Sequence, residues 1–310
     1  MKRFAHGLLV VLILFSSVDG FSAVKKRKQI KAQQPISSNN SIVKMKNYSS
    51  LVVNTDTGKI LHQVNAHETR YPASLTKMMT LFLAFDAINS GKLHMDQKIP
   101  VSAVAARQPC SCISIKEGDT ITVRDAIYAA IIKSANNATY VLGEAIAGTA
   151  ARFSMLMNNK AKELGMKKTN FVNPDGWHHP NHVSTAYDMA LLSIALKKYH
   201  QKYYHMFSEK SFVFKGSVID SHNHVMKKYK WADGLKTGYV RASGFNLATS
   251  ASKPSGNLVA VVMGGQSAEA RDNHMIALLE AGYRKMSNIQ LAHADNDEQK
   301  RSVFSHVNQN

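Results

Sequence analysis

Strand-like segments lie at both ends of this sequence, and helical patterns fill its middle. Apolar and polar residues alternate over 48–54 and 59–64 around Thr57-Gly58, which predicts a hairpin. Further strands are expected at 212–214, 235–239, 245–252 and 258–263. Helical periodicity covers 78–88, 123–133, 137–147, 151–164, 185–199 and about 269–285. The order predicts an α+β fold: one antiparallel sheet built from both ends of the chain, flanked by helices, with an inserted helical lobe and a ligand cleft between the two.

The first of these helices begins with a pattern that suits a nucleophile. Ser74 and Lys77 in Tyr71-Pro72-Ala73-Ser74-Leu75-Thr76-Lys77 are three residues apart, so their side chains are neighbours on one helix face. A helix N-terminus favours an oxyanion developing at Ser74, and a partly desolvated lysine can act as its base. The pattern indicates a serine nucleophile with a lysine base. The alternative is an ordinary amphipathic helix that carries both residues.

Two later motifs strengthen the catalytic interpretation. Ser134-Ala135-Asn136 lies between two expected helices, and Lys236-Thr237-Gly238 lies in an expected strand. The order Ser-x-x-Lys, Ser-x-Asn, Lys-Thr-Gly is the motif set of penicillin-binding proteins and β-lactamases. With the phrases around these motifs, residues 46–286 resemble the D-alanyl-D-alanine carboxypeptidases, the low-molecular-mass penicillin-binding proteins. The resemblance implies the β-lactamase/transpeptidase-like form of the expected fold.

The resemblance also implies an activity and a role for each matching residue. It implies a serine carboxypeptidase that removes the terminal D-alanine from peptidoglycan stem peptides through an acyl-enzyme on Ser74, needs no metal or other cofactor, and is inhibited by β-lactam antibiotics. Lys77 would be the base, and Ser134 with Lys236 would form the proton path to the leaving amine. The remaining roles concern binding: Asn136 would hold a substrate amide, Gly238 would leave room for the substrate backbone, Thr237 and Arg271 would take the terminal carboxylate, and the backbone N–H groups of Ser74 and Tyr239 would form the oxyanion hole. A solvated helix arginine is the alternative for Arg271.

Three other functions would use the same motifs. A DD-endopeptidase that cleaves cross-links is one, because the sequence lacks the β-rich second domain and the apolar-faced C-terminal helix of many family members; residues 287–310 are instead expected to be a polar tail with no membrane anchor. A class A β-lactamase needs a deacylating glutamate between the second and third motifs, and Glu144, Glu163 and Glu209 lack the Leu-Asn that follows it there. A non-catalytic penicillin-binding sensor is the third, and the intact motifs argue against it.

The N-terminal region indicates export. Residues 1–23 have a basic start and an apolar core at 7–15 that is too short to span a membrane, which predicts a signal peptide; an uncleaved anchor is the alternative. Residues 24–45 are expected to be a basic disordered linker, either in contact with anionic lipid or wall polymer or simply solvated. The expected location is periplasmic or secreted. The net charge of +18 suits an anionic surface, whereas nucleic acid is not an expected partner, since no binding module is recognised.

The cysteines and histidines give no metal site. Cys110 and Cys112 are too few for zinc, and a bridge across one intervening residue is strained; a disulfide, two thiols and an intermolecular bridge all stay open. The histidine groups 178–182 and 222–224 have no carboxylate at a helical ligand spacing nearby. We therefore interpret them as polar loop and strand positions without a ligand role.

Overall fold

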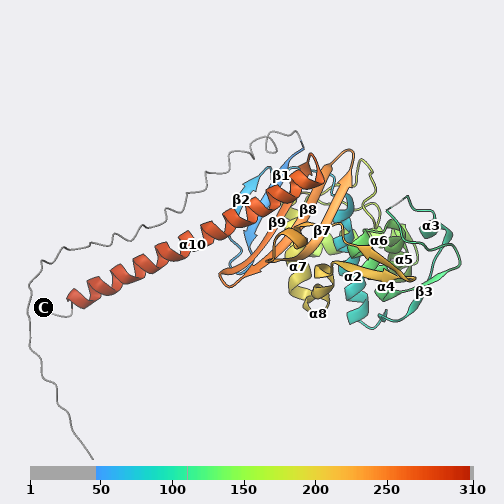
Figure 1. Ribbon diagram of the computed structural model, residues 1–310, viewed down its shortest axis with the longest axis horizontal. Helices are drawn as coiled ribbons and strands as arrows, with labels where there is room; N and C mark the ends of the chain where they lie inside the picture. The colour runs from blue at the N-terminus through green and yellow to red at the C-terminus, as the bar shows by residue number, and fades with distance from the viewer. Residues whose placement is uncertain (1–46, 110, 308–310) are drawn as a thin grey trace, which may run out of the picture. The chain divides into compact units, whose positions relative to one another are not determined.

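The computed structural model describes residues 47–109 and 111–307. The expected signal peptide and linker, and Cys110, lie outside the described residues. A five-stranded antiparallel sheet has the order β2-β1-β9-β8-β7 (Figure 1). Its strands are β1 (Ser49–Asn54), β2 (Ile60–Val64), β7 (Ala232–Val240), β8 (Gly244–Lys253) and β9 (Gly256–Gly265). Because β1 pairs with β9, the two ends of the domain meet in one sheet, which confirms the predicted arrangement.

Both faces of this sheet are buried. Along β1, Leu51 and Val53 belong to one hydrophobic core and Val52 to the other. Along β9, Val261 belongs to the first core and Val262 to the second. Successive side chains of a strand point to opposite faces, so a strand covered on both sides is apolar throughout. This explains why β9 reads as a continuous apolar run rather than an alternating one.

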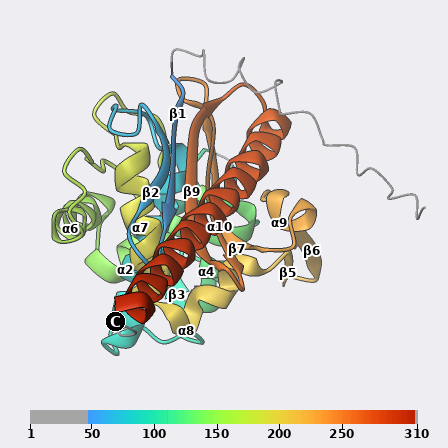
Figure 2. The same cartoon turned by 90° about the vertical axis from the view of Figure 1, so that its left-hand side faces the viewer.

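Helices cover the two faces. The last helix, α10 (Ala268–Val307), crosses one face and buries Met275 and Leu279 there (Figure 2). The prediction that it ends near Lys285 is wrong. No glycine or proline follows Gly282, so nothing in the local sequence breaks the helix. No helix in the described part of the chain is long and apolar enough to cross a membrane.

The helical lobe lies on the other side of the sheet. Its main helices are α2 (Lys77–Asn89), α4 (Val123–Tyr128), α5 (Asn136–Ala147), α6 (Ala150–Glu163) and α7 (Ala186–Tyr199), as predicted, although α4 finishes as a π-helical turn at Ala129–Lys133. Threonine hydroxyls cap three of them: Thr122, Thr149 and Thr185 accept from a backbone N–H three residues on. α7 packs on β1, β8 and β9, and thereby joins the lobe to the sheet.

Short elements complete the chain. Sequence periodicity missed most of them, because each has only a few residues. They are β3 (Lys98–Pro100), α3 (Ala103–Ala106), β4 (Thr120–Thr122), α8 (Gln201–Tyr204), a 3₁₀ turn (His205–Ser208), β5 (Ser211–Phe214), β6 (Ser217–Asp220) and α9 (Val225–Lys228).

Candidate active site

Ser74 lies in a 3₁₀ turn, Ala73–Thr76, which we call the nucleophile turn. The predicted helix follows it and begins at Lys77. Ala73 has a φ of 50°, a left-handed conformation that residues with a side chain rarely adopt. The surrounding structure therefore has to hold the turn in place.

Two glycines on different segments of the chain lie in close contact with the nucleophile turn. A Cβ on Gly176 would lie 1.9 Å from the Ala73 carbonyl oxygen, and Gly176 itself has a φ of +85°. A Cβ on Gly238 would lie 3.0 Å from the Pro72 oxygen and 3.1 Å from the Ser74 nitrogen. At Gly238 we expected the space to serve the substrate backbone. The side chain missing there instead lets β7 approach the nucleophile turn closely.

Asn246 on β8 fixes the entry to this turn. Its amide nitrogen donates to the backbone oxygens of Tyr71 at 3.0 Å and Pro72 at 3.1 Å. Its side-chain oxygen accepts from Gly264 N at 3.0 Å. Through this fully buried amide, the start of β8 and the end of β9 are hydrogen-bonded to the turn.

Lys77 is completely buried beside Ser74. Its Nζ lies 2.8 Å from Ser74 Oγ, 2.7 Å from Asn136 Oδ1 and 2.7 Å from the Asp175 backbone oxygen. Burial lowers the pKa of Lys77 to about 8, against the opposing effect of the Asp175 carboxylate. A lysine with such a pKa is neutral often enough near neutral pH to accept a proton from the adjacent serine.

The other two motifs reach the same place. Ser134 follows the π-helical turn, has a φ of 58° and is buried just before α5 begins. Lys236 is buried on β7, and its Nζ donates to the Thr237 oxygen at 3.1 Å. Burial first, then the charges of Lys77 and Arg271, hold the pKa of Lys236 well below its usual range. For Lys77, burial is the largest effect on the pKa, in agreement with the desolvated lysine expected from the sequence.

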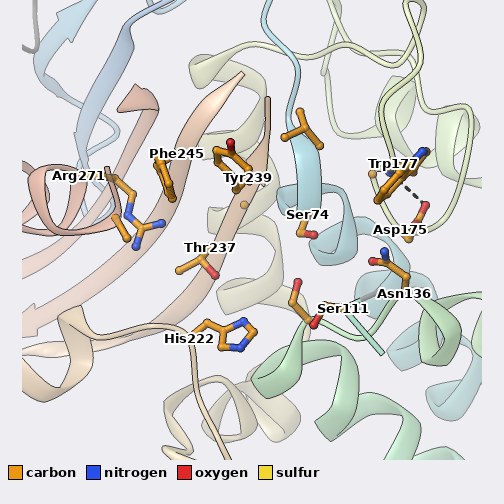
Figure 3. A pocket seen from close by; sticks show the side chains of 15 residues that line it. Ser74, Ser111, Asn136, Asp175, Trp177, His222, Thr237, Tyr239, Phe245 and Arg271 are labelled. Carbon is orange, nitrogen blue, oxygen red and sulfur yellow. Dashed lines mark hydrogen bonds between the residues drawn. The ribbon is translucent and has the colours of Figure 1, made fainter. Parts of the chain in front are cut away.

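A cavity of about 330 Å³ opens over these groups, and Figure 3 shows its lining. Seven of the nine predicted site residues line it: Ser74, Ser134, Asn136, Thr237, Gly238, Tyr239 and Arg271. The other two, Lys77 and Lys236, are buried next to lining residues. All nine residues therefore lie at one place in the structure, and the roles expected of them stay predictions.

Arg271 is not a solvated helix arginine. It is 3% exposed, and its Nε and Nη2 donate to Asp272 at 3.0 and 2.7 Å while Nη1 donates to the Asn246 oxygen at 3.0 Å. The Asp272 carboxylate holds the guanidinium at the edge of the cavity, on the same side as Thr237 (Figure 3).

Several residues of the site were not expected from the sequence. Ser111, Asp175, Trp177, His222 and Phe245 also line the cavity. Asp175 belongs to an Asn-Pro-Asp-Gly turn and Trp177 follows it directly, so the turn is a visible signal for both. No local pattern marks Ser111 or His222, because tertiary packing brings their loops to the site.

His182 corrects the interpretation of its segment as a plain polar loop. The ring is 2% exposed; Nε2 lies 2.8 Å from Thr76 Oγ1, and Nδ1 accepts from Val172 N at 3.1 Å. It links the Asp175 loop to the nucleophile turn. Among the described residues, no group of three or more His, Cys, Asp or Glu could hold a metal ion.

Comparison with known proteins identifies the family of this chain. The family model of the D-alanyl-D-alanine carboxypeptidases matches residues 30–267. The chain belongs to this family. It is 38% identical over 252 residues to D-alanyl-D-alanine carboxypeptidase DacD of Escherichia coli K12, covering 79% of this chain and 65% of that protein. The chain spans just under two thirds of the length of the first curated relatives it matches.

Two further relatives in the family bear on activity and ligands. A D-alanyl-D-alanine endopeptidase of Pseudomonas aeruginosa is 30% identical over 249 residues, 76% of each chain. Penicillin-binding protein D2 of Listeria monocytogenes, solved in its cefotaxime-bound form, is 30% identical with a TM-score of 0.70 and covers 76% of this chain and 96% of its own.

Proposed function

We propose that this protein is a serine D-alanyl-D-alanine carboxypeptidase that removes the terminal D-alanine from peptidoglycan stem peptides. The observation that carries the proposal is the 2.8 Å contact between Ser74 Oγ and the Nζ of a fully buried Lys77. Membership of the carboxypeptidase family supports the choice of substrate. It also separates the chain from the class A β-lactamases.

The proposed reaction has two steps. Ser74 Oγ attacks the carbonyl carbon between the two D-alanines while neutral Lys77 takes its proton. The C–N bond then breaks, the leaving amine receives a proton along the path of Ser134 and Lys236, and D-alanine departs. In the second step water attacks the Ser74 ester, releases the shortened peptide and restores the serine.

Binding groups surround the proposed reaction centre. Asn136, whose amide oxygen is already fixed by Lys77, presents its amide to the substrate, and the backbone N–H groups of Ser74 and Tyr239 stabilise the oxyanion. Thr237 and Arg271 take the terminal carboxylate. β-Lactam antibiotics would acylate Ser74 in the same way, since they place a strained carbonyl where the scissile amide lies; the cefotaxime-bound relative supports this.

Cleavage of peptidoglycan cross-links is the second candidate activity. The Pseudomonas aeruginosa endopeptidase, which this chain matches over 76% of its length, favours it. Both activities break a bond on the carboxyl side of D-alanine and would use the same serine.

For location, we propose export by residues 1–23 to the periplasm or the cell exterior, where peptidoglycan is found. The family match begins at residue 30, after the expected signal. The basic residues that follow the signal would then lie beside an anionic wall or membrane surface.

One experiment tests the activity and separates the two candidates. Purified protein is incubated with a pentapeptide muropeptide and, separately, with a cross-linked dimer, and products are resolved by chromatography. We expect D-alanine release from the pentapeptide, little monomer from the dimer, and neither with Ser74→Ala. Monomer release as the main product would assign the endopeptidase activity, and no product from either substrate would refute both.

A further inference from the structure

The end of the cavity near Thr237 has fewer available hydrogen-bond donors than the motifs suggest. Of the five N–H donors of the Arg271 guanidinium, three are committed to Asp272 and Asn246. The buried Asp272 carboxylate also offsets the arginine's charge. Lys236 donates to a backbone oxygen. A carboxylate arriving here needs a further partner to satisfy its oxygens.

His222 is placed to supply that partner. It lies in the loop between β6 and α9, is exposed, and lines the cavity. Figure 3 shows Thr237 between Arg271 on one side and the His222 ring on the other. The backbone N–H of His222 donates to the Ile132 oxygen at 3.4 Å, which anchors the loop to the helical lobe. Within residues 47–109 and 111–307, no hydrogen bond occupies the imidazole itself.

The charges around His222 favour an anion. The positive charges of Lys236 on β7 and Lys133 at the end of the π-helical turn both act on its ring. Together with partial desolvation, the largest effect, they lower the pKa of His222 to about 4. At neutral pH the ring is therefore neutral, keeps one N–H donor, and lies in a positive field that attracts a carboxylate.

We propose that His222 is a substrate-binding residue that joins Thr237 and Arg271 in holding the α-carboxylate of the residue the enzyme releases. This inference rests on the proposed function and adds a specificity-determining residue to it. The hydrogen bond from His222 N to the Ile132 oxygen keeps this loop beside the Ser134 element.

Matched substrates test the proposal. Steady-state kinetics are measured with a tripeptide ending in D-Ala-D-Ala and with its C-terminal amide, for wild type, His222→Ala, His222→Gln and His224→Ala. His224 is exposed on the same loop and does not line the cavity, so it is the matched control. A hydrogen bond to a charged group is worth about 10-fold or more in binding. We expect His222→Ala to lower kcat/KM for the free acid about 10-fold, mainly through KM, and to leave the amide within about 2-fold.

The remaining outcomes separate binding from structure. His222→Gln, which keeps a donor, should recover much of the loss, and His224→Ala should behave as wild type. Equal losses with the acid and the amide would overturn the proposal. If the wild type cleaves neither peptide, the proposed function fails. The role of His222 is then tested by comparing the rates of acylation by benzylpenicillin and by its methyl ester, in wild type and in His222→Ala. A loss confined to the free acid would still support the inference, and an equal loss would overturn it.

Discussion

The contact between Gly176 and the nucleophile turn makes Gly176→Ala an informative perturbation. An added Cβ would lie 1.9 Å from the Ala73 oxygen and 2.8 Å from Thr76 Oγ1. Ordinary contact requires the two segments to separate by about 1.5 Å. Left-handed alanine costs roughly 1 kcal/mol and the overpacking about 1–3 kcal/mol more, so unfolding free energy should fall by about 2–4 kcal/mol.

The same displacement should slow acylation. The Gly176 segment carries the Asp175 oxygen that fixes Lys77 Nζ at 2.7 Å, and a shift of about 1 Å in a catalytic group can cost roughly 100-fold in rate. Stopped-flow acylation with a fluorescent penicillin and urea unfolding measure the two effects. Gly165→Ala is the control, because Gly165 has a φ of +77° with nothing within 4 Å of its Cβ position. It should lose about 1 kcal/mol and acylate normally. Acylation of Gly176→Ala at the wild-type rate would refute the role given to this contact.

Three further predictions concern the base, the turn and export. The acylation rate should rise with pH through the Lys77 pKa of about 8, since only neutral Lys77 accepts the proton. Lys236→Ala removes a like charge beside Lys77, so the rise of the acylation rate should move to higher pH. Asp175→Asn removes an opposite charge, so the rise should move to lower pH. A shift of either pH–rate profile in the other direction would contradict that prediction. Asn246→Ala should destabilise the protein by about 2 kcal/mol or more in urea unfolding, because it leaves buried backbone groups unpaired; an unchanged midpoint would refute this. N-terminal sequencing of exported protein should start near residues 21–24, and a sequence beginning at Met1 would indicate an uncleaved anchor.

The sheet and the main helices were predictable because their signals are local. Apolar periodicity places β1, β8, β9, α2, α5 and α7 close to their observed positions. The extent of α10 was not predictable from an apolar face, since its polar residues still favour a helix. The left-handed Ala73 was not predictable either, because the turn packs against two segments distant in sequence, those of Gly176 and Gly238.

The candidate site likewise contains residues that local signals reveal and residues that only tertiary packing places. Its motif residues could be found because each motif combines a spacing with a local structure, as Ser74 and Lys77 do at a helix start. Asp175 and His222 reach the cavity on loops, where neither periodicity nor spacing fixes the position of a side chain. Arg271 was correctly placed at the cavity, but its pairing with Asp272 became clear only from the packing around it.

The most direct test of the central claim is to locate the acyl group. Protein is incubated with benzylpenicillin, digested, and mapped by mass spectrometry. Three serines line the cavity, Ser74, Ser111 and Ser134, so the map distinguishes real alternatives. We predict one penicilloyl adduct, on the peptide that contains Ser74, and none in Ser74→Ala. An adduct on Ser111 or Ser134, or one that persists in Ser74→Ala, would contradict the assignment of Ser74 and Lys77 as nucleophile and base.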